Sequence, residues 1–187
     1  MTLRGPWLRW VEQGLLAAGI AIAVWCGVLI FRAEMVARLP VPAPEPAAPG
    51  AVRQPPARGA WVARMIAPSV RLSATVLEGS DDATLARGAG HIEYTSLPGE
   101  PGNVGIAGHR DTTFMAVKRL RTGDPIELTT NGGIYRYVVT RTFIVEPEDV
   151  HVLGETDRPT LTLVTCYPFD AVNPGGPLRY VVVAEAA

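Results

Sequence analysis

The chain of 187 residues has no excess of either charge, since 17 lysines and arginines stand against 18 aspartates and glutamates. Proteins that bind nucleic acid generally carry a basic excess, so this balance argues against nucleic acid as a partner. The chain is also poor in cysteine and histidine, with only two and three of them. It has no internal repeat and no alternation of strands with long helices, which argues against repeat architectures and parallel α/β folds.

An uncharged run, GLLAAGIAIAVWCGVLIF, covers residues 14–31. A helix over this run would be about 27 Å long, close to the thickness of a membrane's hydrocarbon core. A helix that is apolar on every face needs lipid or a large protein around it, and the rest of this chain is small. We therefore predict a transmembrane anchor at 14–31 behind a cytoplasmic head at 1–13. A buried core helix and a cleaved signal peptide are the alternatives.

The charges around this run hardly decide its orientation, because Arg4 and Arg9 precede it and Arg32 and Arg38 follow it. An N-terminal anchor with a short head and a long C-terminal part normally places the long part outside the cytoplasm. We take this orientation as the working prediction.

Residues 32–60 are rich in proline and alanine, with seven prolines between Pro40 and Pro56. Proline lacks a backbone N–H and fixes φ, so this segment cannot form a regular helix or a central strand. We predict an extended, semi-rigid spacer that holds the following domain away from the membrane. A proline-rich ligand for a partner domain is the weaker alternative.

The remaining residues, 61–187, are predicted to form a mainly β domain with about seven or eight strands and one or two short helices. Strand patterns cover residues 69–78, 125–130, 134–145, 159–167 and 178–185, and a β-like run leads into residue 109. A short helix is predicted within 81–92, where Gly88 can end it before a strand-like segment at His91, and one or two helical turns are predicted at 111–120. Strands this close together, with turn signals between them, indicate a barrel or a sandwich.

Cys166 stands near the end of the strand pattern at 159–167. If the domain lies outside the cytoplasm, Cys26 in the anchor cannot reach it, so the two cannot form a disulfide. A lone cysteine in an oxidising compartment indicates either a reactive thiol or a buried, inert one. A nucleophilic cysteine works best beside a histidine or another cation that favours its thiolate.

Two further residues can serve such a cysteine. His109 lies where the β-like run ends and the chain turns, a place from which a rigid scaffold presents catalytic groups, whereas His91 and His151 are interpreted as structural. Arg179 starts the next strand after Cys166, and adjacent antiparallel strands would place the two side by side. A guanidinium there can stabilise an oxyanion, and a solvated edge arginine is the alternative.

Three stretches resemble, in order along the chain, the signatures of a known family. GNVGIAGHRDT at 102–112 contains His109, TLVTC at 162–166 ends at Cys166, and LRYVV at 178–182 contains Arg179. With an anchor in front, they resemble the histidine segment, the TLxTC signature and the arginine strand of the sortases, which are cysteine transpeptidases. The resemblance covers roughly residues 61–187, and TCYPF is similar to the class D branch.

The resemblance implies a sortase-type β-barrel of about eight strands, preceded by one transmembrane helix. It also implies the roles of the site residues: Cys166 as the nucleophile, His109 as the general acid and base, and Arg179 as the residue that orients the substrate and stabilises the oxyanion. Thr165 matches the signature threonine and is expected to help at the oxyanion site.

The substrates implied by the resemblance are proteins with a C-terminal LPxTG-like sorting signal, cleaved after its threonine. The acyl group would form a thioester on Cys166 and pass to an amine of a cell-wall precursor or a pilin lysine. The catalytic domain would lie outside the cytoplasm, held at the cell membrane through residues 14–31. No cofactor is expected; calcium in the acidic loop of Glu146, Glu148 and Asp149 is an alternative to solvent-facing acids there.

Two other functions compete with this interpretation. An L,D-transpeptidase also uses cysteine, histidine and arginine, but its signature places glycine where Thr165 precedes the cysteine. A non-catalytic, membrane-tethered barrel that binds peptide or cell wall belongs to a different class of function. The presence of Cys166, His109 and Arg179 together argues against a non-catalytic binding barrel.

Overall fold

The computed structural model describes residues 6–38, 55–170 and 175–187. The chain divides into two compact units, Met1–Val41 and Pro42–Ala187. The first contains α1 (Pro6–Arg38), a helix of 33 residues. This helix includes the run at 14–31 and continues past it, so residues 32–38 are helical and not part of an extended spacer.

The predicted helix at 14–31 is thus present, but its membrane role is not confirmed. Among the residues that the structure describes, no helix combines the length and the hydropathy needed to cross a membrane. The proline-rich part of the predicted spacer, residues 39–54, lies outside the described residues. Anchoring and the spacer's conformation stay predictions.

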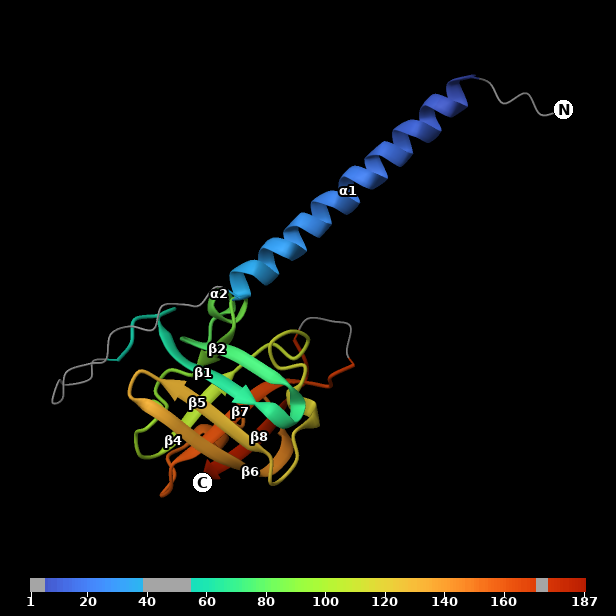
Figure 1. Cartoon of the computed structure of the whole chain (residues 1–187). Coiled ribbons are helices and arrows are strands. Elements are labelled where there is room, and N and C mark those ends of the chain that lie inside the picture. Colours follow the sequence, from blue (N-terminus) through green and yellow to red (C-terminus); the bar gives the residue numbers. More distant parts are fainter. Residues whose placement is uncertain (1–5, 39–54, 171–174) are drawn as a thin grey trace. The chain divides into compact units, whose positions relative to one another are not determined.

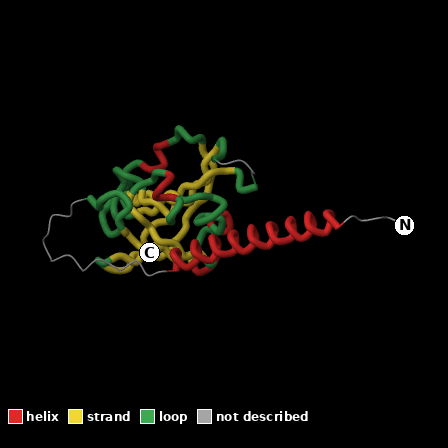
Figure 2. Tube along the Cα trace, turned by 90° about the horizontal axis from the view of Figure 1, so that it is seen from above, coloured by secondary structure: helices red, strands yellow, loops and turns green. Residues whose placement is uncertain are grey.

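The second unit is a closed barrel of eight strands in the order β1-β2-β3-β4-β7-β8-β6-β5 (Figures 1 and 2). The strands are β1 (Trp61–Ala67), β2 (Leu72–Glu78), β3 (Ala89–His91), β4 (Asn103–Ala107), β5 (Pro125–Thr130), β6 (Gly133–Val145), β7 (Thr160–Tyr167) and β8 (Leu178–Ala186). The short helical segments are η1 (Pro68–Val70), α2 (Asp82–Leu85), η2 (Val117–Arg119) and η3 (Val150–Leu153). The predicted mainly β barrel is confirmed.

Two strands had no clear signal in the sequence. β1 buries Val62 and Ala63 in succession next to a shift in its register, so its alternation of buried and exposed residues extends only from Ala63 to Ala67. β3 has three residues and contains Gly90; the short helix predicted within 81–92 was expected to end at Gly88, and a strand-like segment was expected to begin at His91, the last residue of β3. Only α2 in that segment is a helix, and Asp81 caps it by accepting hydrogen bonds from two backbone N–H groups. Residues 89–91 form a strand because they pair with β2 and β4 in the folded barrel.

The segment 111–120, predicted to form one or two helical turns, forms turns and the 3-10 helix η2. Phe114, Val117 and Leu120 are fully buried in the barrel core. Their spacing of three residues matches the period of a 3-10 helix, in which side chains at i and i+3 lie in line. The segment after residue 109 is therefore fixed to the core.

Most neighbouring strands are antiparallel, but β4 and β7 pair in parallel, with Ala107 opposite Val164. β7 also pairs with β8 antiparallel. Parallel neighbours end at the same edge of a sheet, so the chain leaves β4 and β7 at the same end of the barrel. This pairing brings the turn after β4 to the last residues of β7.

Core packing can be tested at Leu163, which is fully buried in β7. We expect Leu163→Ala to lower the free energy of unfolding by about 2–5 kcal/mol, because the lost methyl groups leave a cavity. Ile134→Ala, at a site 50% exposed, should cost less than about 1 kcal/mol. Urea denaturation followed by tryptophan fluorescence measures both, and equal losses would contradict the assignment of Leu163 to the core.

Candidate active site

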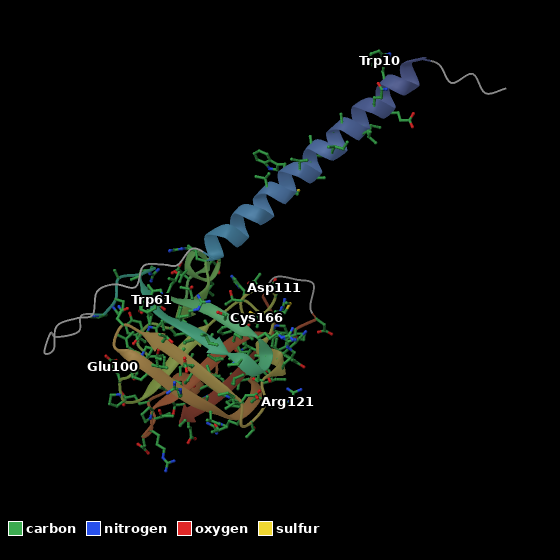
Figure 3. The ribbon with its side chains drawn as sticks, viewed as in Figure 1. Trp10, Trp61, Glu100, Asp111, Arg121 and Cys166 are labelled. Atoms are coloured by element: carbon green, nitrogen blue, oxygen red, sulfur yellow. The ribbon has the colours of Figure 1, made fainter. Side chains whose placement is uncertain are left out.

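Side chains of β7 alternate between the two faces of the barrel wall. Leu161 and Leu163 are fully buried among the core residues. Cys166 belongs to the opposite, outward set and is partly exposed, with a free thiol. Figure 3 shows Cys166 well apart from Glu100, on the other side of the barrel in that view. The thiol therefore lies at the end of a rigid strand and within reach of solvent.

Arg179 is the register partner of Cys166 on β8. The expected adjacency of the two residues is confirmed. Arg179 donates two hydrogen bonds from Nη1, to the backbone carbonyls of Gly176 at 2.9 Å and Leu178 at 3.0 Å. Neither bond uses Nη2 or Nε, and a guanidinium carries five N–H donors. Arg179 is thus held by backbone carbonyls next to it in the chain. The N–H groups on its Nη2 and Nε take no part in these two hydrogen bonds.

His109 lies in the turn that follows β4, and two backbone hydrogen bonds fix this turn. Gly108 N–H donates to the carbonyl of Val164 at 3.2 Å, and Phe114 N–H donates to the carbonyl of His109 at 2.8 Å. A Cβ on Gly108 would lie only 2.7 Å from the Phe114 ring, so the aromatic ring packs on a position that needs glycine. The histidine is partly exposed at the barrel end where β7 also terminates.

The structure thus brings the segments of His109, Cys166 and Arg179 together, as the sequence predicted. Thr165 is different, because it belongs to the inward set of β7 and is only 3% exposed. Its hydroxyl donates to the carbonyl of Gly108 at 2.7 Å. In this arrangement its single hydroxyl proton is already used, and the predicted help at an oxyanion stays a prediction.

Arg110 was not singled out from the sequence, yet it is among the most buried charged residues at this end of the barrel. It is 5% exposed, and its Nη1 donates to the carbonyl of Pro168 at 2.8 Å. Its position directly after His109 in the AGHRDT stretch was the available signal. The guanidinium joins the histidine turn to the chain that follows the cysteine.

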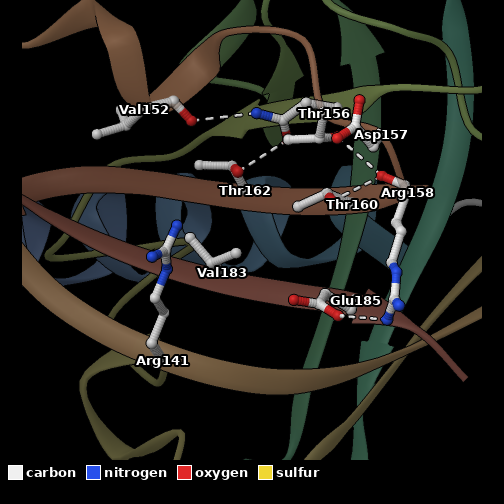
Figure 4. Close-up of a pocket in the computed structure, with 10 residues that line it drawn as sticks. Arg141, Val152, Thr156, Asp157, Arg158, Thr160, Thr162, Val183 and Glu185 are labelled. Carbon is white, nitrogen blue, oxygen red and sulfur yellow. Dashed lines mark hydrogen bonds and ion pairs between the residues drawn. The ribbon is translucent and has the colours of Figure 1, made fainter.

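A hollow of about 260 Å³ lies on the same outward face of the barrel wall (Figure 4). Its floor includes Thr162 of β7, Val183 of β8 and Arg141 of β6. An adjoining hollow of about 370 Å³ shares Arg141 and Val183 and adds Phe143. Both are bordered by the loop between β6 and β7, which contains η3.

The register places these hollows in line with the cysteine. Along β7 and β8, the pair Cys166 and Arg179 is followed by Val164 with Val181 and then by Thr162 with Val183. Each step of two residues along a strand covers about 6.6 Å, so the row of Thr162 is about 13 Å from the row of Cys166. This length matches about four residues of an extended peptide.

The other two histidines lie elsewhere. His91 is buried, with Nδ1 at 2.8 Å from Glu78 Oε2 and Nε2 at 3.0 Å from the carbonyl of Ser96, which fits the structural interpretation. His151 is exposed, and its Nδ1 lies 3.8 Å from Asp149 Oδ1. It also borders the larger hollow, which the sequence did not indicate.

The acidic loop gives no support to the calcium alternative. Asp149 Oδ2 accepts a hydrogen bond from the backbone N–H of Glu146 at 3.2 Å, so its carboxylate holds the loop itself. Within residues 6–38, 55–170 and 175–187, no three histidine, cysteine or acidic side chains gather as a metal site would require.

The curated proteins that this chain resembles are sortases. A family model described as Sortase domain matches residues 65–187. Sortase D of Bacillus subtilis is 32% identical over 119 residues, which cover 63% of this chain and 60% of that protein. Sortase A of Listeria monocytogenes is 33% identical over 133 residues, which cover 68% of this chain and 57% of that protein. The chain thus spans about six tenths of the length of these relatives.

Solved structures agree with the sequence relatives. The Clostridium perfringens Sortase D5 transpeptidase superposes with a TM-score of 0.64 at 33% identity, over 70% of this chain and 81% of that chain. Sortase C of the same species, solved with the C-terminal cell wall sorting motif, gives a TM-score of 0.64 at 25% identity, over 70% and 72% of the two chains. Because the family match runs from β1 to the end of β8 and includes D-type relatives, this chain belongs to the sortase family and is class D-like.

Proposed function

We propose that this chain is a cysteine transpeptidase that cleaves an LPxTG-like sorting signal and transfers the acyl part to an amine. The observation that carries the proposal is the register pair of Cys166 and Arg179, at the barrel end where the turn with His109 emerges. Membership of the sortase family supports it. The chain provides a nucleophile, a proton carrier and a fixed positive charge, the three groups that acyl transfer needs.

The first step is attack by the Cys166 sulfur on the carbonyl carbon of the motif threonine. A carbon–sulfur bond forms, the carbon–nitrogen bond breaks, and the leaving amine takes a proton from His109. In the second step an acceptor amine attacks the thioester carbon and gives a proton to His109, while the Cys166 thiolate leaves. One amide is broken and one is formed, so no oxidant or reductant is needed.

Arg179 supplies positive charge where the carbonyl oxygen becomes an oxyanion. Its guanidinium stays charged throughout the accessible pH range, and its planar fork can hold an oxygen with more than one N–H. The two bonds from Nη1 to the loop carbonyls fix the side chain before substrate arrives. A preorganised donor of this kind stabilises a transition state more than one that must reorient.

The outward face of β7, β8 and β6 is the proposed path of the substrate peptide. Extended chain from Cys166 to the hollow at Thr162 and Val183 covers about 13 Å, enough for the residues that precede the cleaved bond. The loop between β6 and β7 borders this path, so it is expected to select the peptide. The Clostridium perfringens sortase C that was solved with the C-terminal cell wall sorting motif supports a peptide ligand of this class.

The acceptor amine, whether of a cell-wall precursor or a pilin lysine, remains a prediction. Anchoring through residues 14–31 and the position outside the cytoplasm also remain predictions. The membrane-tethered binding module stays the alternative from another class, and the experiment below separates it from an enzyme.

The full chain with Cys26→Ser leaves Cys166 as its one cysteine. We expect this chain, mixed with a small library of LPxTx peptides, to form a covalent adduct that hydroxylamine releases, because a thioester reacts with that amine. Intact mass spectrometry measures the adduct, and Cys166→Ala is the control that should form none. A chain that iodoacetamide labels at Cys166 but that no peptide acylates would indicate a binding module or another substrate.

Arg179→Lys keeps the charge but loses the planar fork. We expect kcat/KM for a sorting peptide to fall about a hundredfold, the size seen when one oxyanion donor is lost. Arg136→Lys, on the exposed side of β6 and 3.2 Å from Glu127, is the matched control and should stay near wild type. Near-normal turnover by Arg179→Lys would show that the arginine contributes no directional hydrogen bond.

The peptide path can be blocked at Thr156, an exposed loop residue that borders both hollows. We expect Thr156→Trp to raise KM about tenfold, because the indole fills space that the peptide would occupy. The rate of Cys166 labelling by iodoacetamide should not change. Thr122→Trp is the control, since Thr122 is exposed and borders neither hollow. Equal KM values for the two variants would place the peptide elsewhere.

A further inference from the structure

Two buried polar side chains tie the segment of the histidine to the segment of the cysteine. Thr165 donates its hydroxyl proton to the carbonyl of Gly108 at 2.7 Å. Arg110 donates from Nη1 to the carbonyl of Pro168 at 2.8 Å. The first bond joins the residues that directly precede Cys166 and His109. The second joins residues that follow them. The two segments are therefore clamped together on both sides of the reacting groups, although they are far apart in the sequence.

The burial of these side chains argues that their bonds matter. Arg110 is 5% exposed and Thr165 is 3% exposed. Removing a guanidinium or a hydroxyl from water costs free energy that only well-placed hydrogen bonds recover. Apolar side chains of similar size would fill the same space without that cost. Packing alone therefore does not account for a threonine and an arginine at these two positions.

Arg110 also reaches the loop that holds the third site residue. A Cβ on Gly176 would collide with the carbonyl of Tyr167 and would lie 3.1 Å from Arg110 Nη1. Gly176 therefore lies directly beside the guanidinium, at a position that requires glycine. The carbonyl of the same Gly176 accepts a hydrogen bond from Arg179 Nη1 at 2.9 Å. Arg110 thus contacts the histidine turn, the chain after the cysteine, and the loop that fixes Arg179.

We propose that Arg110 and Thr165 are positioning residues that set His109 against Cys166, and that Arg110 also fixes the loop that holds Arg179. Neither side chain acts on the substrate in this role, because both are buried and donate to backbone carbonyls. The catalytic meaning of the inference rests on the proposed function. The spatial relation of the histidine to the cysteine can be measured without any peptide substrate.

The test uses the full chain with Cys26→Ser and measures how fast iodoacetamide alkylates Cys166 across a range of pH. A neighbouring histidine shapes this profile, so His109→Ala gives the reference for its loss. We expect Thr165→Val and Arg110→Met to move the profile toward that of His109→Ala. Circular dichroism checks the fold, and Arg110→Lys, which lacks the planar fork, replaces Arg110→Met if the latter does not fold.

Three variants separate positioning from general loss of stability. Thr165→Ser keeps the hydroxyl and should retain the wild-type profile. Thr84→Val removes another buried hydroxyl, which donates to a carboxylate at 2.9 Å, far along the chain in α2. Arg119→Met removes another arginine that donates to a backbone carbonyl at 2.8 Å. Both of these controls should lower stability while leaving the alkylation profile unchanged.

Acylation by a sorting peptide gives the second readout. We expect Thr165→Val and Arg110→Met to slow adduct formation about tenfold to a hundredfold, since small misplacements of catalytic groups have effects of this size. In the His109→Ala background, Thr165→Val should slow it little further, because the effect acts through the histidine. Additive losses would indicate a merely structural role.

The outcomes are distinct. The inference is overturned if His109→Ala leaves the alkylation profile of wild type unchanged. It is equally overturned if Thr165→Val and Arg110→Met keep the wild-type profile while His109→Ala changes it. If the profile changes as expected but no LPxTx peptide forms an adduct, the proposed function fails and the positioning role stands.

Discussion

The site depends on one constraint, which is the hydrogen-bonded register of β7 between β4 and β8. Side chains alternate along a strand, so a slip of one residue would exchange its inward and outward sets. Leu161 and Leu163 lie in the core and hold the register. Exposing both side chains to water would cost several kcal/mol of folding free energy, because their apolar surface would no longer be buried. With these leucines inward, Cys166 points outward opposite Arg179. Core packing therefore fixes the positions of two site residues at once.

The position of His109 depends on contacts other than strand pairing. Its segment is neither strand nor helix, and a loop at the end of a strand has few backbone partners of its own. The turn gains them from Val164 through Gly108, from Phe114 packed on that glycine, and from the hydroxyl of Thr165. A sheet register and a buried polar contact thus act together. Within the described parts of the chain, no buried side-chain nitrogen or oxygen lacks a hydrogen-bond partner.

The barrel separates the strand that carries Cys166 from the loop that we propose contacts the substrate peptide. The strand residues behind Cys166 are buried, whereas the loop between β6 and β7 is largely exposed and borders both hollows. Under the proposed function, changes in that loop would alter peptide selection without disturbing the register of β7. This division is common in folds whose loops carry specificity, because the scaffold's stability does not depend on them.

The sequence by itself determined the mainly β class and most strands, and it led to the proposal of three site residues. The strand patterns of β7 and β8, joined by a loop long enough to connect antiparallel strands, were enough to predict that Cys166 and Arg179 are neighbours. It did not reveal β1, whose alternation is short and is interrupted where Val62 and Ala63 are both buried, and it did not give the bounds of β3, which depend on pairing with β2 and β4. The segment 111–120 was predicted to contain one or two helical turns, and the tertiary structure shows that these are turns and a 3-10 helix whose apolar residues repeat every three positions. Only the tertiary structure showed that Thr165 points inward and that Arg110 clamps the site, because both depend on carbonyls 57 and 58 residues away in the sequence.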